Sequence, residues 1–243
     1  MNRHECYGII PARFNSTRFP GKPMTDILGK PMFWHVYNRA SQCSKLKQVV
    51  LATDNNTIFA KAKQLDVPVV MTRNDHPSGT DRVMEAAQIL NLPDHAVIVN
   101  IQGDEPAIEP DMLSELVDPF SNPVVQVTTL ARKIDSKQAA SADQVKVVFS
   151  KSNHALYFSR SLIPYGVDTD TYTYYGHIGL YAFRMKSLKK FVTLEQSSLE
   201  IAEKLEQLRL IENDIPVHVV VTAHKSVSVD RPEDLKKVLE ILG

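Results

Sequence analysis

Short apolar, β-rich runs alternate with amphipathic segments through the first half of the 243-residue chain. We expect strands near 6–12, 48–53, 67–72 and 96–102, and helices near 31–44, 56–65 and 79–91. This alternation predicts βαβ units, in which each helix returns the chain so that the next strand lies parallel to the last. The expected fold class is therefore α/β, with a mostly parallel central sheet.

The second half of the chain has a different pattern. Strand-like runs at 124–133, 143–150 and 177–183 are separated by long polar connections, which favours antiparallel additions to the sheet. One continuous helix is predicted from Ser198 to Asn213, followed by a strand at 216–221 and a helix at 232–242. We therefore expect a single domain over 1–243 with a mixed antiparallel insertion around 124–195.

The composition limits the possible functions. Lys plus Arg equals Asp plus Glu at 28 each, so the net charge indicates neither a nucleic-acid partner nor an anionic membrane. Cys6 and Cys43 show no CxxC spacing and no signal peptide precedes them, so both are expected to be reduced packing residues. Apolar runs such as Ala96 to Val99 are too short to span a bilayer. A soluble, cytoplasmic protein is expected.

The segment "IIPARFNSTRFPGKP" (9–23) follows the first strand and carries Arg13, Arg18 and Lys22. Ligands of α/β sheets bind beyond the carboxyl ends of the strands, where this loop would lie. The loop has neither the GxGxxG nor the Walker pattern, since proline follows Gly21-Lys22. Its side-chain cations, with the hydroxyls of Ser16 and Thr17, would therefore meet phosphates directly. A solvated basic loop is the alternative.

Two acidic positions are candidate metal ligands. Asp104 follows an apolar strand and Gly103, so its carboxylate should lie at the carboxyl edge of the sheet, where Mg²⁺ could bind together with substrate phosphates. A Gly-Asp-Glu-Pro turn explains the same residues without a function. Asp230 precedes "RPE", and here the alternative is a helix N-cap with Glu233 at the N3 position.

Several motifs together resemble the sugar-activating cytidylyltransferases, and most closely the 3-deoxy-manno-octulosonate (Kdo) cytidylyltransferase family. The opening motif is "IIPARFNSTRFPGKPMTDILGKPM", and the resemblance extends over essentially the whole chain. The later motifs are "LATD", "MTRNDHPSGTDR", "IVNIQGDEP", "VKVVFS", "ALYFSRSLIP", "GHIGLYAF", "LEQLRLIE" and "VDRPEDL". The chain departs from the family pattern at Ser228 and Arg231, and at "IPYGV" and "GHIGLY" beside the implied sugar pocket.

The resemblance implies a Rossmann-like nucleotidyltransferase fold and assigns site residues. The implied catalytic residues are Arg13, Arg18, Lys22 and Asp104, and the implied metal ligands are Asp104 and Asp230. The implied CTP-binding residues are Arg13, Ser16, Lys22, Arg73, Ser78 and Gln102. The implied sugar-binding residues are Arg160, His177, Tyr181, Glu206 and Gln207. The insertion at 124–195 would bind the sugar and form a dimer.

The implied reaction is transfer of CMP from CTP to the anomeric hydroxyl of Kdo, with Mg²⁺ as cofactor and release of pyrophosphate for lipopolysaccharide biosynthesis. Such chemistry depends on positioning and charge neutralisation, and no covalent enzyme intermediate is expected. Alternatives are the same reaction on 8-amino-3,8-dideoxy-manno-octulosonate or an acylneuraminate, and a non-catalytic nucleotide-binding protein. The resemblance also implies a homodimer.

Overall fold

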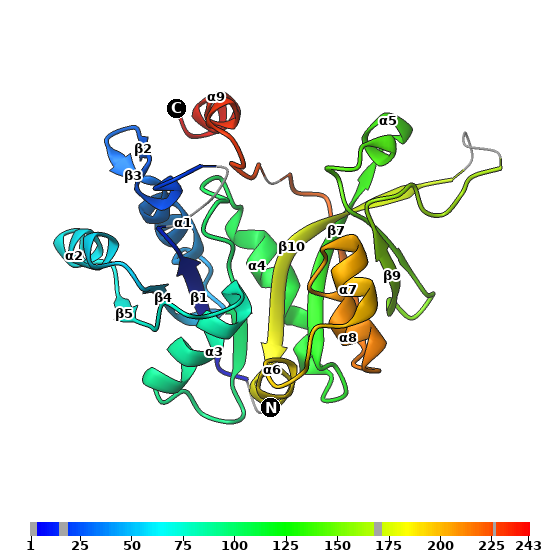
Figure 1. The fold of residues 1–243 in the computed structure, drawn as a ribbon, viewed down its shortest axis with the longest axis horizontal. Coiled ribbons are helices and arrows are strands. Elements are labelled where there is room, and N and C mark those ends of the chain that lie inside the picture. The colour runs from blue at the N-terminus through cyan, green and yellow to red at the C-terminus, as the bar shows by residue number, and fades with distance from the viewer. Residues whose placement is uncertain (1–3, 15–18, 168–171, 226) are drawn as a thin grey trace.

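The computed structural model describes residues 4–14, 19–167, 172–225 and 227–243, and a central sheet organises them (Figure 1). Its strands lie in the order β11-β7-β10-β6-β1-β4-β5. Their bounds are β1 (Cys6–Ala12), β4 (Leu46–Thr53), β5 (Val69–Met71), β6 (Val97–Asn100), β7 (Val127–Ile134), β10 (Tyr174–Arg184) and β11 (Val217–Thr222).

The strand directions confirm the predicted α/β fold with a mostly parallel sheet. β1 pairs in parallel with β4 and β6, β4 with β5, and β11 with β7. β10 pairs antiparallel with both β6 and β7, so along this path it runs against the other strands. The expected antiparallel additions are present as β8 (Lys146–Phe149) and β9 (Ala155–Ser159), and Figure 1 shows β10 extending from the sheet toward them.

Helices cover both faces of the sheet because neighbouring residues of a strand point to opposite sides. Ile10 packs with α1 (Met32–Ala40), α2 (Asn56–Gln64) and α4 (Pro110–Val117). Ile9 belongs to the other cluster, which includes residues of α3 (Gly79–Ile89), α6 (Met185–Phe191) and α8 (Leu208–Glu212). Both faces of the central strands are thus buried, which explains their unbroken apolar runs.

The prediction of one continuous helix from Ser198 to Asn213 is wrong. The segment forms α7 (Ser198–Glu203) and α8, separated by Lys204 in the left-handed conformation with φ 53°. The backbone N–H of Leu205 then donates to the carbonyl of Glu200, which ends the first helix. Apolar residues keep helical spacing across the break, so their period did not reveal it.

The connections in the second half contain more structure than predicted. α5 (Ser136–Ala140) interrupts one of the polar connections and β9 another. Near the C-terminus, a 3₁₀ turn (Pro232–Asp234) precedes α9 (Leu235–Leu242). Val238 of α9 packs against Ile27, at the end of the small strand β2 (Asp26–Ile27), which pairs with β3 (Lys30–Pro31).

Two compositional predictions can be compared with the structure. Cys6 and Cys43 are buried and free, which confirms their role as packing residues. None of the helices in the described part of the chain is long and apolar enough to cross a membrane.

Candidate active site

The opening loop and the acidic turn after β6 meet through an ion pair. A 3₁₀ turn (Lys22–Met24) follows Gly21, whose φ of 70° favours glycine. Nζ of Lys22 donates to Oδ2 of Asp104 at 2.7 Å and to the carbonyl of Val229 at 2.8 Å. The Lys22 and Asp104 side chains are 15% and 27% exposed. The predicted proximity of this cation and this carboxylate is therefore confirmed.

The topology explains this meeting. β1 and β6 are adjacent parallel strands, so their carboxyl ends open at the same edge of the sheet. Gly103 permits the close approach, because a Cβ built there would lie 2.8 Å from the carbonyl oxygen of Pro11. Asp104 follows at once, and its position is thereby tied to the end of β1.

Asp230 lies in the segment joined to the same turn. The backbone N–H of Val229 donates to the carbonyl of Asp104 at 2.8 Å, so these two chain segments are held together. The alternative interpretation of Asp230 as the helix N-cap is wrong. Arg231 occupies the N-cap position, and Oδ2 of Asp234 accepts from the backbone N–H groups of Asp230 and Arg231 at 3.1 and 3.0 Å.

The donor set at this edge fits a hard divalent cation. Among the described residues no group of three or more His, Cys, Asp and Glu side chains could hold a metal ion. Mg²⁺ commonly uses only one or two carboxylates and takes its other ligands from phosphates and water. Asp104 and Asp230, brought to adjoining segments, match that chemistry.

Arg13 leaves the end of β1 toward a cluster of charged side chains. Burial lowers its pKa, and the nearby Arg82 charge acts in the same direction. Its Nη2 atom is buried without a hydrogen-bond partner among the described residues, which is the arrangement expected of a group reserved for an anion. Ser16 and Arg18, predicted to contact the triphosphate, lie outside the described residues.

The N-terminus of α3 holds the predicted base-side residues. Oγ of Ser78 caps the helix by accepting from the backbone N–H groups of Thr80 and Asp81, and it donates to Oδ2 of Asp81 at 2.6 Å. Arg73 is 67% exposed, and its Nε lies 3.6 Å from Asp75. Nε2 of Gln102 donates to the carbonyl of Gly179 at 3.0 Å. The structure thus holds Ser78 and Gln102 in place and leaves Arg73 on the surface.

A buried ion pair behind these residues was missed from the sequence. Arg82 is fully buried, and its Nη2 donates to Oδ2 of Asp54 at 2.6 Å. Its Nη1 donates to the hydroxyl of Thr72 at 2.5 Å and to the carbonyl of Arg73 at 3.1 Å. The motifs "LATD" and "SGTDR" contain both partners, but nothing local indicates that they pair. This pair joins the end of β4 to α3 and to the backbone at Arg73.

Glu206 reaches the same helix start from the other side. Its Oε2 accepts from the hydroxyl of Thr80 at 2.8 Å, and Nδ2 of Asn100 donates to that hydroxyl at 3.3 Å. Oε1 of Glu206 lies 3.9 Å from Nη2 of Arg209. Burial raises the pKa of Glu206, and the Ser78 and Thr80 hydroxyls and the Arg209 charge oppose that rise. Thr80 and Asn100 were also missed as members of this site.

His177 and Tyr181 lie together on β10. The Tyr181 hydroxyl is 2.9 Å from Nε2 of His177, and the Thr129 hydroxyl is 3.0 Å from the same nitrogen. Burial lowers the pKa of His177 to about 3, so the imidazole is neutral at pH 7. Burial also raises the pKa of Tyr181, and the charge of Glu206 contributes to that rise. The structure therefore brings His177, Tyr181 and Glu206 into one neighbourhood.

The two remaining sugar-side candidates are held by their own surroundings. Nε of Arg160 donates to the carbonyl of Glu203 at 3.0 Å, and its Nη1 donates to the carbonyl of Ala142 at 3.3 Å. Gln207 is 8% exposed and occupies the N-cap position of α8. Arg160 thus joins β9 to the end of α7, three residues before Glu206.

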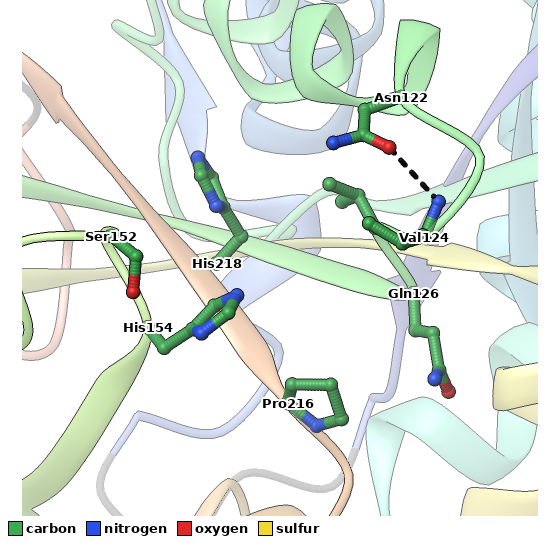
Figure 2. Close-up of a pocket in the computed structure, with 8 residues that line it drawn as sticks. Asn122, Val124, Gln126, Ser152, His154, Pro216 and His218 are labelled. Atoms are coloured by element: carbon green, nitrogen blue, oxygen red, sulfur yellow. Dashed lines mark hydrogen bonds between the residues drawn. The ribbon is translucent and has the colours of Figure 1, made fainter.

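Two cavities differ in their relation to these residues. A cavity of about 600 Å³ is lined by Ser78, Asp81 and Glu206 and continues along α7 and Arg209. A second, of about 240 Å³, lies at the β11 edge, where Figure 2 shows His154 and His218 with their rings beside each other. None of the predicted site residues lines the second cavity. Ser78 and Glu206 are the predicted site residues that line the first cavity.

Comparisons with known proteins agree with this geometry. The sequence pattern of the family described as Cytidylyltransferase matches residues 7–239. A 3-deoxy-manno-octulosonate cytidylyltransferase of Oleidesulfovibrio alaskensis is 60% identical, over 100% of this chain and 98% of the relative. An 8-amino-3,8-dideoxy-manno-octulosonate cytidylyltransferase of a Shewanella species is 44% identical, over 94% and 95%.

A solved structure supports the same assignment. The structure of CMP:2-keto-3-deoxy-manno-octonic acid synthetase in complex with CTP superposes with a TM-score of 0.93 at 40% identity, covering 98% of each chain. The chain belongs to the cytidylyltransferase family of nucleotidyltransferases.

Proposed function

We propose that this enzyme transfers CMP from CTP to the anomeric hydroxyl of Kdo, giving CMP-Kdo and pyrophosphate. The single observation that carries the proposal is the meeting of Lys22 with Asp104 at 2.7 Å on the sheet edge where nucleotides bind. The relative that is 60% identical over the whole chain has a name that states this activity.

The cationic groups at the strand ends would receive the triphosphate. Arg13 follows the end of β1, Lys22 begins the 3₁₀ turn after it, and Nη2 of Arg13 has no hydrogen-bond partner among the described residues. Their charges would stabilise the negative charge that develops on the leaving pyrophosphate. Arg18 and Ser16 lie on the same loop segment and are proposed to assist.

Asp104 and Asp230 would hold Mg²⁺ beside these cations. When bound, Mg²⁺ would neutralise phosphate oxygens and polarise the α-phosphate. The chain's own contribution is to fix the two carboxylates on hydrogen-bonded segments and to orient Lys22 from the opposite side.

The sugar acid would bind between α3, β10 and the α7–α8 turn. The proposed sugar-binding residues are Arg160, His177, Tyr181, Glu206 and Gln207. Because His177 is neutral at pH 7, it can donate or accept a hydrogen bond but cannot pair with the sugar carboxylate as a cation. Among the proposed sugar-binding residues, Arg160 carries the positive charge and is assigned to the carboxylate. The CTP base side is assigned to Arg73 and Ser78, and Gln102 is assigned as a CTP-binding polar contact beside the metal.

A pyrophosphate-release assay tests the proposal directly. Purified protein is incubated with CTP and Kdo, 8-amino-Kdo or N-acetylneuraminate, with Mg²⁺ and with excess chelator. We expect Mg²⁺-dependent release with Kdo and formation of CMP-Kdo. Release with another sugar acid alone would move the assignment to that substrate. Binding of CTP without turnover of any sugar acid would indicate a nucleotide-binding protein instead.

One alternative has specific support. The 44% identical Shewanella relative has a name that states activity on the 8-amino sugar, and the two activities share the reaction class. The 60% identity to the Kdo enzyme favours Kdo.

We further propose a cytoplasmic homodimer that supplies CMP-Kdo to lipopolysaccharide biosynthesis. The insertion around 124–195 exposes large apolar side chains, including Leu156 at 58%, Tyr165 at 85% and Val167 at 89%. Apolar surface of this kind is typical of association sites. Light scattering coupled to gel filtration should give twice the 27.3 kDa chain mass, and Tyr165→Lys should shift the protein toward monomer.

A further inference from the structure

A hydrogen-bonded chain crosses the candidate site and joins three elements. Asn100 ends β6, Thr80 lies in the first turn of α3, and Glu206 precedes α8. Nδ2 of Asn100 is 3.3 Å from Oγ1 of Thr80, which is 2.8 Å from Oε2 of Glu206. Thr80 and Asn100 are only 4% and 3% exposed. The chain is therefore shielded from water at its centre.

Chemistry sets the direction of these hydrogen bonds. An ionised carboxylate only accepts, so the single hydroxyl proton of Thr80 is directed to Glu206. The Thr80 oxygen can then only accept from Asn100, which must present its NH₂ group. This requirement places Oδ1 of Asn100 on the side of the amide that faces away from Thr80.

Each end of this hydrogen-bonded chain has an acceptor without a hydrogen bond to any described residue, although Oε1 of Glu206 lies 3.9 Å from Nη2 of Arg209. Oδ1 of Asn100 and Oε1 of Glu206 are buried and have no hydrogen-bond partner among the described residues. Leaving such atoms unpaired is costly, so their usual explanation is a ligand or an ordered water. Two buried acceptors, together with the unpaired Nη2 donor of Arg13 on which the Glu206 charge acts, match a molecule with several hydroxyls and one anionic group.

The hydroxyl of Thr80 is not needed to start α3. Oγ of Ser78 already accepts from the backbone N–H groups of Thr80 and Asp81, at 3.1 and 3.2 Å. A helix cap therefore does not account for the Thr80 hydroxyl, whose described partners are Glu206 and Asn100.

We propose that Thr80 is a positioning residue that holds Glu206 for the sugar hydroxyls, and that Asn100 both orients Thr80 and binds a sugar hydroxyl through Oδ1. This inference rests on the proposed function, because it assigns the hydrogen-bonded series Asn100–Thr80–Glu206 to the sugar-acid side of the site. It predicts that losing the Thr80 hydroxyl impairs sugar recognition and leaves CTP recognition intact.

Steady-state kinetics of Thr80→Val and Thr80→Ser test the proposal. Valine matches threonine in shape but lacks the hydroxyl, so the KM for the sugar acid should rise about tenfold or more while the KM for CTP changes less than about twofold. Thr80→Ser keeps a hydroxyl and should restore most of the sugar affinity. In the Glu206→Gln background, Thr80→Val should add less than about threefold, because both changes remove the same interaction.

Thr128→Val is the matched control. Thr128 is also fully buried, and its hydroxyl donates to the carbonyl of Leu116 at 2.7 Å, on β7 and away from Glu206. This variant should lose stability without changing either KM. If Thr80→Val behaves as Thr128→Val does, or if the effects of Thr80→Val and Glu206→Gln multiply independently, the proposal is overturned.

A titration that needs no substrate separates this inference from the proposed function. The side-chain carboxyl carbon of Glu206, assigned with Glu206→Gln, is followed by ¹³C NMR. Thr80→Val removes a donor to the ionised carboxylate, so the pKa of Glu206 should rise above its wild-type value, and Thr80→Ser should not change it. The charged and titratable groups that act on Glu206 are unchanged in both variants: Arg13, Asp81, Tyr181 and Arg209.

The two failures are distinguishable. If wild-type protein activates no sugar acid, the proposed function fails, and the titration still decides whether Thr80 holds Glu206. If wild-type activity is present but Thr80→Val shifts neither the pKa of Glu206 nor the sugar KM, the proposed function stands and the role of Thr80 is rejected.

Discussion

The two ends of the candidate site differ in how they would bind a polar ligand. The ion-paired end consists of Lys22, Asp104 and the 229–230 segment, and its charged groups already have partners. The buried polar end consists of Asn100, Thr80 and Glu206, and two of its acceptors have no hydrogen-bond partner among the described residues. A ligand at the first end exchanges one partner for another, whereas a ligand at the second supplies hydrogen bonds that the protein lacks.

This difference has energetic consequences. A partly exposed ion pair contributes only about 0–1 kcal/mol, so Lys22 can change partners at little cost. A buried acceptor without a hydrogen bond costs about 1–3 kcal/mol. The ion-paired end is thus suited to an anion that arrives and leaves with the reaction, and the buried polar end to selection of the correct hydroxyl pattern.

The largest effect is expected at Asp104. Asp104→Asn keeps the shape of the side chain but removes its charge, and kcat should fall by about 10³-fold with the melting temperature nearly unchanged. Asp94→Asn is the matched control, because Asp94 forms an ion pair with Lys189 at 2.5 Å on the surface. Near-normal production of CMP-sugar by Asp104→Asn would remove this carboxylate from the mechanism.

Lys22→Met should have the next largest effect. Loss of the cation should lower kcat/KM for CTP by about 10²-fold and leave the KM for the sugar acid within about threefold. Lys189→Met, from the same surface pair, should change neither constant. Thr80→Val is expected to give the reverse pattern, so a parallel loss of sugar and CTP affinity in both variants would show that the two ends do not act separately.

His177 tests the neutral character of the buried polar end. Its pKa is about 3 in the folded protein against the ordinary 6.5, so the unfolded chain binds more protons between those values. Stability therefore falls as the pH drops from about 6.5 toward 3. Between pH 7 and pH 5, the free energy of unfolding measured by urea titration should fall by about 1–2 kcal/mol less in His177→Gln than in wild type. Equal losses in both proteins would mean that His177 titrates normally.

The smallest effects separate Asp230 from Asp234. Asp234→Ala removes the carboxylate that accepts from two backbone N–H groups before α9, so the free energy of unfolding should fall by about 1 kcal/mol with activity retained. Asp230→Ala should reduce the Mg²⁺-dependent rate with little loss of stability. Calorimetry measures the stability of both variants, and the rate assay measures their activity. If Asp230→Ala loses stability but keeps its Mg²⁺-dependent rate, Asp230 is a structural residue.

Sequence reasoning succeeded where local pattern and topology rules suffice. Apolar runs located the central strands, and the rule that parallel strands open at one edge correctly placed Lys22 beside Asp104. The two residues are 82 positions apart, yet they lie on the segments that follow β1 and β6, two adjacent strands of the same sheet. The predicted strand arrangement was therefore sufficient to predict this contact.

It failed where contacts depend on backbone details or on distant partners. Before α9, Arg231 occupies the N-cap position and the Asp234 carboxylate accepts from the backbone N–H groups of Asp230 and Arg231, a local arrangement that the residue pattern alone does not specify. Thr80 and Glu206 are 126 positions apart, and neither lies at a predicted strand end. Asn100 does leave a signal, since a polar residue that closes a buried apolar run needs a partner.

Lys204 shows that the backbone, together with the hydrogen bond from Thr80, sets where the Glu206 carboxylate lies. A lysine in the left-handed conformation is disfavoured by about 1–2 kcal/mol, so the surrounding structure must hold it there. A β-branched residue at 204 would favour continuation of α7 and turn Glu206 away from Thr80, whereas glycine would retain the turn. The range of sugars accepted by this enzyme could thus be altered from a position whose side chain is not required to contact any of them.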